Sequence, residues 1–153
     1  MARKLASSIL ILGAVFFSAC NDSTPVEPEP GGARLELSLA SDTVGLGQRV
    51  LITLTLLNDS SGPLRLQFPT SCQVDLVVEQ AGLEVWSLMS RSFCALGVTT
   101  FTLQPGQSIR YQLSWDQSRN DGGPPQPGLY NVRGILQTAD LLHAAPAFLT
   151  VRP

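Results

Sequence analysis

The segment SIRYQLSW, residues 108–115, alternates apolar and polar side chains along its whole length. Its apolar side chains, at every second position, are those of Ile109, Tyr111, Leu113 and Trp115. Successive side chains of a β-strand point to opposite faces, so this alternation predicts a strand with one face on a core and one in water. No segment of the chain sustains the period of 3.6 residues that is typical of an amphipathic helix.

The same period of two recurs on both sides of this segment, and turn-forming residues such as Pro105-Gly106 separate the runs. We expect nine strands, near residues 34–40, 49–57, 64–68, 73–79, 83–89, 98–103, 107–115, 129–137 and 147–152. Short strands at this spacing predict an all-β fold, an immunoglobulin-like antiparallel β-sandwich of about 8–9 strands in one domain, residues 34–153. Tyr130 lies two residues after the turn at Pro127-Gly128, near the start of a predicted strand. This placement is typical of a tyrosine corner.

The N-terminus has the order of a secretory signal peptide, with Arg3 and Lys4 before the apolar run Leu5–Phe17. As a helix this run would span about 20 Å, which is short of the ~30 Å hydrocarbon core of a bilayer. The stretch Phe17-Ser18-Ala19-Cys20 resembles the bacterial lipobox, in which a peptidase cuts before the cysteine and the sulfur carries a diacylglyceryl group. We therefore expect residues 1–19 to be a lipoprotein signal peptide and Cys20 to be the site of lipid attachment.

The alternative is an ordinary cleaved signal peptide with an incidental cysteine.

Residues 20–33 are rich in proline and end in Gly31-Gly32 and Ala33 without apolar periodicity, so we expect a disordered tether. The expected location is the bacterial cell envelope, extracytoplasmic and facing the periplasm or the surface, with the membrane as a partner through the lipid on Cys20.

Cys72 and Cys94 flank a predicted hairpin, whose strands at 73–79 and 83–89 are joined by a turn at Gln80–Gly82. An antiparallel pair brings its outer ends together, and export places the chain where disulfides persist. We expect a disulfide between these two cysteines, and the alternative is two buried free thiols.

Composition argues against several kinds of function. Without Arg3 and Lys4 the chain has 8 basic and 12 acidic side chains, so the expected mature net charge of −4 disfavours nucleic-acid binding. His143 is the only imidazole and lies in a loop-like stretch, so neither a metal site, a nucleophilic triad nor a cofactor is expected. Asp75 and Glu79 are expected on the solvated face of the hairpin, and not as a pair of carboxylates that converge in a cleft, as in a glycosidase. We therefore expect no enzymatic activity.

Several segments share their order and spacing with a known family. They are Phe68, Gln73–Val78, Gly82–Trp86, Phe93, Leu103–Gln107, Tyr111, Trp115-Asp116 and Pro127–Val132. In these segments the chain, from about Val50 to Arg152, resembles the BsuPI family of intracellular proteinase inhibitor domains. The resemblance implies an immunoglobulin-like β-sandwich and inhibition of a serine proteinase, and it places Trp86, Tyr111, Trp115 and Tyr130 in the framework.

These observations favour a membrane-anchored lipoprotein whose sandwich binds a protein, such as an exported proteinase that it inhibits. The candidate binding loop is Met89, Ser90, Arg91, Ser92 and Phe93, in which Arg91 suits a trypsin-like pocket. An ordinary strand connection with a solvated arginine is the alternative for this loop. The alternative function is a structural or accessory envelope lipoprotein without inhibitory activity, whose partner is another envelope protein. The loop 116–128 is either a second contact surface or disordered.

Overall fold

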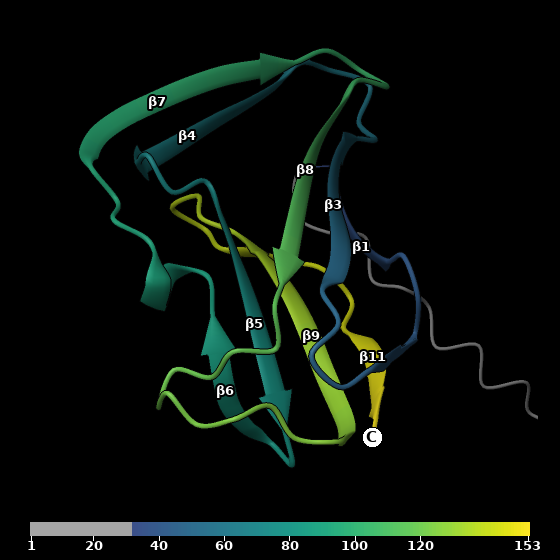
Figure 1. The fold of residues 1–153 in the computed structure, drawn as a ribbon. Helices are drawn as coiled ribbons and strands as arrows, with labels where there is room; N and C mark the ends of the chain where they lie inside the picture. The colour runs from purple at the N-terminus through teal and green to yellow at the C-terminus, as the bar shows by residue number, and fades with distance from the viewer. Residues whose placement is uncertain (1–31) are drawn as a thin grey trace, which may run out of the picture.

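The computed structural model describes residues 32–153, and these fold into sheets that form a β-sandwich (Figure 1). The first sheet contains β1 (Ala33–Leu39), β3 (Val50–Asn58) and β8 (Ser108–Trp115), in that order. The central strand β3 places Leu54 opposite Leu37 on one side and Tyr111 on the other. The alternation in residues 108–115 therefore lies on an edge strand of this sheet.

The second sheet has the order β2 (Thr43–Gly45), β11 (Ala147–Arg152), β9 (Gly128–Leu136), β5 (Val74–Gln80) and β6 (Leu83–Ser87). The short strand β10 (Leu142–His143) also pairs with β9. The strand pairs of this part of the chain are all antiparallel except that of β2 with β11, which is parallel. Strands β5 and β6 form the predicted hairpin, and its turn residues Ala81 and Gly82 both have positive φ angles, 51° and 77°. Two positive φ angles are the geometry of the type I′ turn that favours hairpins.

A third sheet of two strands, β4 (Leu64–Thr70) and β7 (Leu96–Leu103), arches over one end of the molecule (Figure 1). The side chain of Asn58, which is fully buried at the end of β3, joins this sheet to the first one. Its amide nitrogen donates hydrogen bonds to the carbonyl groups of Gly62 and Leu103, both at 2.8 Å. Burial of an amide is favourable only when its donors are satisfied in this way.

Two groups of apolar side chains fill the interior. The first lies between the two larger sheets, where Ile52 and Trp115 face Leu76, Val78 and other side chains of the second sheet. Gly134 on β9 also packs closely against the first sheet, because a Cβ atom there would lie 2.4 Å from a methyl carbon of Leu54. A larger residue at this position would force the side chains of Leu54 and Leu37 to move.

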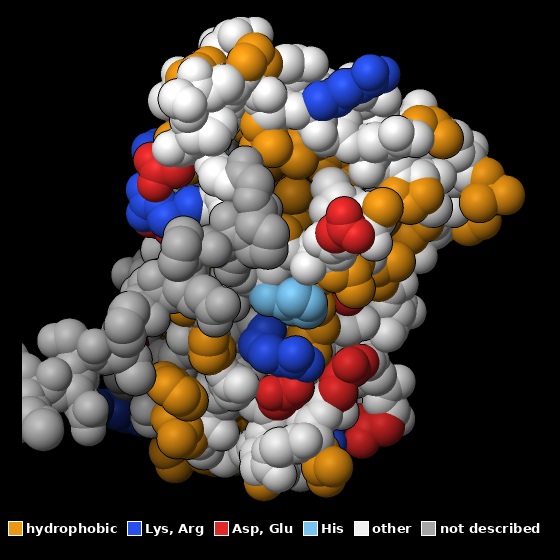
Figure 2. All heavy atoms as spheres, turned by 180° about the vertical axis from the view of Figure 1, so that it is seen from behind, with side chains coloured by type: hydrophobic (Ala, Val, Ile, Leu, Met, Phe, Trp, Pro, Cys, Tyr) orange, Lys and Arg blue, Asp and Glu red, His pale blue; other side chains and the backbone are white. Residues whose placement is uncertain are grey.

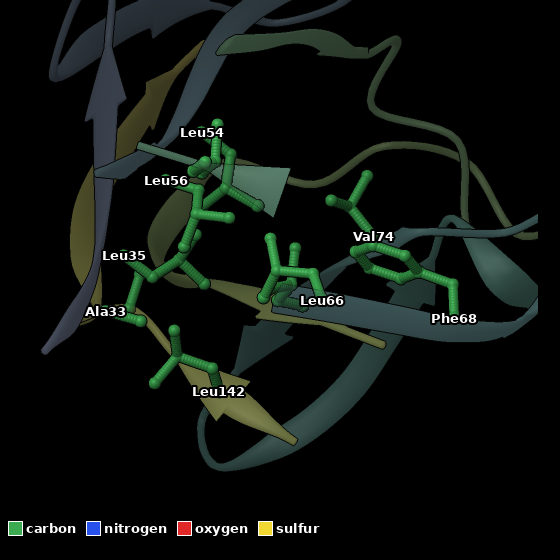
Figure 3. Close-up of a cluster of buried hydrophobic side chains, with 11 residues drawn as sticks. Ala33, Leu35, Leu54, Leu56, Leu66, Phe68, Val74 and Leu142 are labelled. Atoms are coloured by element: carbon green, nitrogen blue, oxygen red, sulfur yellow. The ribbon is translucent and has the colours of Figure 1, made fainter. Parts of the chain in front are cut away.

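The second group lies under the arch of β4 and β7. Leu66 and Phe68 from β4 point toward Val74 of β5 and toward leucines of β1 and β3 (Figure 3). The ring of Phe68 is fully buried and its centroid lies 5.1 Å from that of Phe101 on β7. Burial of these large side chains contributes about 1.5–3 kcal/mol each, so the two-stranded sheet is held to the body mainly by this group.

Trp115 and Tyr130 connect the sandwich to the long loop between β8 and β9. Their rings meet edge to face with centroids 5.1 Å apart. The indole nitrogen of Trp115 donates to the carbonyl of Ser118, and the hydroxyl of Tyr130 donates to the carbonyl of Gln126 at 2.6 Å. The second bond is the backward contact that defines a tyrosine corner.

The nine strands predicted from the sequence are all present, with ends that differ by a few residues. The alternation missed β2 and β10, which have three and two residues and are too short to show a period. The prediction that His143 lies in a loop was wrong, because it belongs to β10 and is exposed opposite Ile135. Among residues 32–153, no helix is long and apolar enough to cross a membrane.

Candidate functional site

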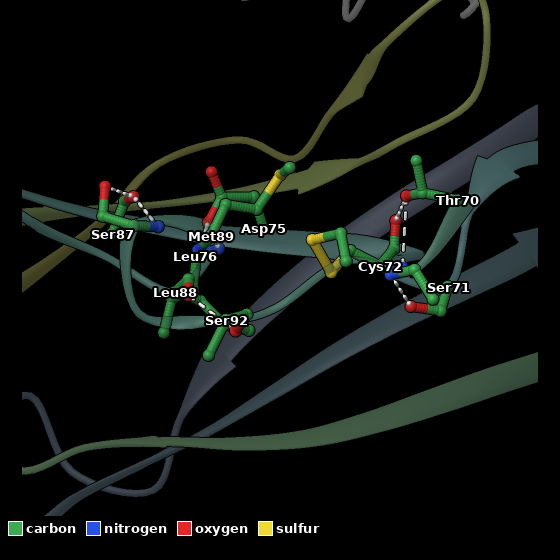
Figure 4. Close-up of a disulfide and its surroundings, with 12 residues drawn as sticks. Thr70, Ser71, Cys72, Asp75, Leu76, Ser87, Leu88, Met89 and Ser92 are labelled. Atoms are coloured by element: carbon green, nitrogen blue, oxygen red, sulfur yellow. Dashed lines mark hydrogen bonds between the residues drawn. A yellow bond between two sulfur atoms is a disulfide. The ribbon is translucent and has the colours of Figure 1, made fainter.

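The candidate binding loop connects β6 to β7 and begins with the one-turn 3₁₀ helix η1 (Met89–Arg91). Serine side chains shape this turn locally. The amide of Ser90 donates to the hydroxyl of Ser87 at 3.1 Å, and the hydroxyl of Ser92 donates to the carbonyl of Leu88 at 2.7 Å (Figure 4). Such short-range bonds from serine offer the backbone an alternative to a strand ladder, which explains why β6 ends at Ser87.

Asp75 fixes the start of the loop, a role that the sequence did not reveal. Its Oδ1 atom accepts hydrogen bonds from the amides of Leu76 at 2.8 Å and of Met89 at 3.0 Å. The prediction that Asp75 lies on a solvated face was wrong: it is 8% exposed, because the chain around Met89 folds back over it. Glu79 is only partly buried and forms an ion pair with Arg133 at 2.6 Å.

A disulfide between Cys72 and Cys94 fixes the other end of the loop (Figure 4), as expected from the sequence. The two Cα atoms are 5.3 Å apart. Next to the bridge, Ala95 and Ser71 bond to each other twice: the amide of Ser71 donates to the carbonyl of Ala95, and the amide of Ala95 donates to the hydroxyl of Ser71, each at 3.0 Å. The loop is therefore attached to β5 at its start and to the end of β4 at its close.

The loop 116–128 packs beside the candidate loop and is ordered by specific contacts, which removes the alternative that it is disordered. The side chain of Gln117 is 1% exposed and donates to the carbonyl groups of Gly45 and Gln48 at 2.8 and 2.7 Å. The amide of Asn120 donates to the carbonyl of Val85 at 2.8 Å. These bonds place the carbonyl of Arg119 where the guanidinium group of Arg91 donates to it.

An open hollow of about 350 Å³ lies between the two loops. It is lined by Arg49, Trp86, Arg91, Ser114, Asp116 and Ser118. Hydrogen bonds from the hydroxyl and then the amide of Ser118 hold the pKa of the Asp116 carboxyl below its usual value. The guanidinium and hydroxyl groups around this hollow provide donors for the carbonyl or carboxylate groups of a bound polypeptide.

The five residues of the candidate loop differ in accessibility. Met89 is half-buried, whereas Ser90, Arg91, Ser92 and Phe93 are exposed. Phe93 is 93% exposed, and the next large apolar side chain, Leu96, is exposed to the same extent. Three of the four expected framework aromatics, Trp86, Trp115 and Tyr130, are buried. The fourth, Tyr111, is partly buried, and its burial raises the pKa of the hydroxyl.

Other predicted features lie elsewhere. Cys20, the signal peptide and the tether up to residue 31 are outside the described residues. Within residues 32–153, no three side chains of histidine, cysteine, aspartate or glutamate are grouped so that they could hold a metal ion. The residues that sequence reasoning missed are Asp75, Ser87, Asn120 and Gln117. The signal for Ser87 was the repeated serine at positions 87, 90 and 92.

The fold and the loop define a class of protein: a small β-sandwich that presents an exposed segment held at both ends. The chain belongs to the BsuPI family, described as intracellular proteinase inhibitor, whose model matches residues 36–141. This match begins and ends earlier than the resemblance seen in the sequence from about Val50 to Arg152. Membership of this family supports a role like that of a proteinase inhibitor. A comparison with curated proteins found no relative.

Solved structures share the fold at low identity. The sporulation control protein Spo0M from Bacillus subtilis is 15% identical with a TM-score of 0.51, and the match covers 80% of this chain and 50% of that one. The alkylpurine DNA glycosylase AlkC from Pseudomonas fluorescens, bound to DNA with an abasic site analogue, is 16% identical with a TM-score of 0.50, covering 80% of this chain and 31% of that one. This chain thus spans half or less of either structure, and the likeness concerns the fold alone.

Proposed function

We propose that this protein is a lipid-anchored, extracytoplasmic lipoprotein whose β-sandwich binds and inhibits a proteinase through the segment Met89–Phe93. The observation that carries the proposal is the attachment of this exposed segment at both ends, by Asp75 before it and by the disulfide after it. A loop that is already ordered loses little conformational entropy on docking, so more of its contact energy appears as affinity. The match to a proteinase inhibitor family supports the same function.

The proposal includes no catalysis by this chain. The sandwich acts by occupying the substrate cleft of its partner, and Arg91 with the neighbouring hollow provides polar contacts beside the loop. The location outside the cytoplasm is supported by the signal-like N-terminus, and by the disulfide, since such bonds persist in oxidising compartments.

Inhibition is tested by titrating the purified, oxidised protein against a panel of serine proteinases of differing specificity. We expect inhibition of at least one member with a dissociation constant in the nanomolar range, which is typical of interfaces of this kind. Full activity of every member at about 10 μM protein, some thousandfold above that expectation, would contradict the proposal. Crosslinking in the native envelope that captures a stable envelope component and no proteinase would favour the accessory role instead.

The anchor is tested by metabolic labelling with a fatty acid analogue. The unchanged protein is expected to take up the label and to stay in the membrane fraction after a high-salt wash. The variant Cys20→Ser should take up none, because serine lacks the thiolate that forms the thioether. Labelling of both proteins, or of neither, would show that Cys20 is not the site of attachment.

A further inference from the structure

The structure distinguishes two residues of the binding segment that could enter the pocket of a proteinase, Arg91 and Phe93. Arg91 is already engaged within the protein. Its amide donates to the carbonyl of Leu88 at 3.1 Å, and its guanidinium group donates to the carbonyl of Arg119 in the neighbouring loop. To enter a partner's pocket, Arg91 would have to give up the second bond and leave the 3₁₀ turn.

Phe93 makes no comparable hydrogen bonds within the described residues. Its side chain is 93% exposed, and it is followed by Leu96 and Val98, which are 93% and 65% exposed. Hydrophobic side chains protrude at the edge of the molecule where β7 begins, on the right in Figure 2. A cluster of exposed large apolar side chains on a small domain marks a site of interaction.

The main chain at Phe93 is also free to pair. Among the described residues, no hydrogen bond is made by the amide or carbonyl of Phe93 or of Cys94, whereas the amides on either side, of Ser92 and Ala95, are both bonded. Ser92 is extended, with φ −111° and ψ 143°. An extended segment with free main-chain groups can add to a partner as a strand, and its side chain then selects the pocket.

The absence of charged residues around Phe93 in the sequence favours a partner with an apolar pocket. The chain has no charged residue between Arg91 and Arg110, a stretch that contains Phe93, Leu96 and Val98. A charged specificity pocket would lose its hydration against Phe93 without gaining a partner, whereas an apolar pocket would gain buried area. The disulfide at the adjacent residue restricts the backbone, so that little order is lost when Phe93 enters such a pocket.

We infer that Phe93 is the residue that occupies the primary specificity pocket, and that the partner is a proteinase with a large apolar pocket, as in enzymes of chymotrypsin-like specificity. This inference rests on the proposed inhibitory function and replaces Arg91, and with it a trypsin-like target, as its specificity element. Leu96 and Val98 extend the apolar contact on the far side of the disulfide. Arg91 remains at the border of the hollow, where its bond to Arg119 holds the two loops together.

The experiment compares three variants, Phe93→Ala, Arg91→Ala and Phe148→Ala, with the unchanged protein on one chymotrypsin-like and one trypsin-like enzyme. Phe148 is the matched control, because it is 62% exposed on β11 and lies outside the binding segment. We expect the unchanged protein to inhibit the chymotrypsin-like enzyme, Phe93→Ala to weaken this inhibition about 100-fold, and Phe148→Ala to leave it unchanged. Thermal melting should show Phe93→Ala to be folded, since it removes an exposed side chain.

The outcomes separate this inference from the proposed function. Inhibition of only the trypsin-like enzyme, or inhibition lost in Arg91→Ala but retained in Phe93→Ala, overturns the assignment to Phe93 and leaves the inhibitory function standing. Absence of inhibition of both enzymes by the unchanged protein, together with failure on the wider panel, overturns the function and this assignment with it. The further variant Phe93→Arg is expected to move inhibition toward the trypsin-like enzyme.

Discussion

Replacement of Trp115 by alanine is expected to lower the free energy of unfolding by about 3–5 kcal/mol. The side chain is 1% exposed between the two larger sheets, so alanine leaves a cavity that the packed β-strands around it cannot fill. The edge-to-face contact with Tyr130 and the bond from the indole nitrogen to Ser118 are lost as well. Because domains of this size are stable by only about 5–15 kcal/mol, this is a large part of the total.

Urea denaturation followed by circular dichroism measures this loss. Leu129→Ala is the matched control, since Leu129 is 61% exposed on β9, and we expect it to change stability by no more than about 0.5 kcal/mol. Trp115→Phe should give an intermediate loss, because it keeps most of the ring and removes the nitrogen donor. If Trp115→Ala cost no more than the Leu129 control, the proposed packing between the sheets would be contradicted.

Removal of the disulfide has the second largest expected effect. The double variant Cys72→Ser/Cys94→Ser should lose about 3 kcal/mol, since the bridge closes a loop across a sequence separation of 22 and so restricts the unfolded chain. It should also bind a proteinase more weakly, because the binding segment keeps its attachment at Asp75 but loses the covalent one at its close. Faster hydrogen exchange at the amide of Ala95 would report this loosening directly.

A reducing agent provides the control for this prediction. It should lower the stability of the unchanged protein by a similar amount and should leave the double variant unaffected. If the double variant matched the oxidised protein in stability and in exchange at Ala95, the bridge would have no part in holding the loop.

The sequence predicted the long strands because an alternation over seven to nine residues, as in Val50–Asn58, records which face is buried. It could not predict that β4 and β7 form a separate sheet. The pairing of β4 with β7 joins residues such as Leu64 and Leu103, and the Asn58 side chain attaches this pair to the first sheet through a hydrogen bond to Leu103 across 45 positions of the chain. Such long-range pairing is not encoded in any local period.

The candidate loop shows the same difference between what local sequence patterns predict and what long-range contacts decide. The sequence predicted the position of the loop before Cys94. It could not predict which side chain is available to a partner, because Arg91 is held by a hydrogen bond to the carbonyl of Arg119, 28 positions away. Asp75 was misplaced for a related reason. The alternation with Val74 and Leu76 correctly directs its side chain away from the core between the sheets, but the turn at Met89 then folds over it.

The position of β11 has a consequence for how the protein is made. Although β11 follows every other described strand in sequence, it lies inside its sheet, between β2 and β9. Without β11, β9 would have an unpaired edge along Gly128–Val132, and β2 would have no partner in this sheet. The second sheet can therefore be completed only once residue 152 is available to the folding chain.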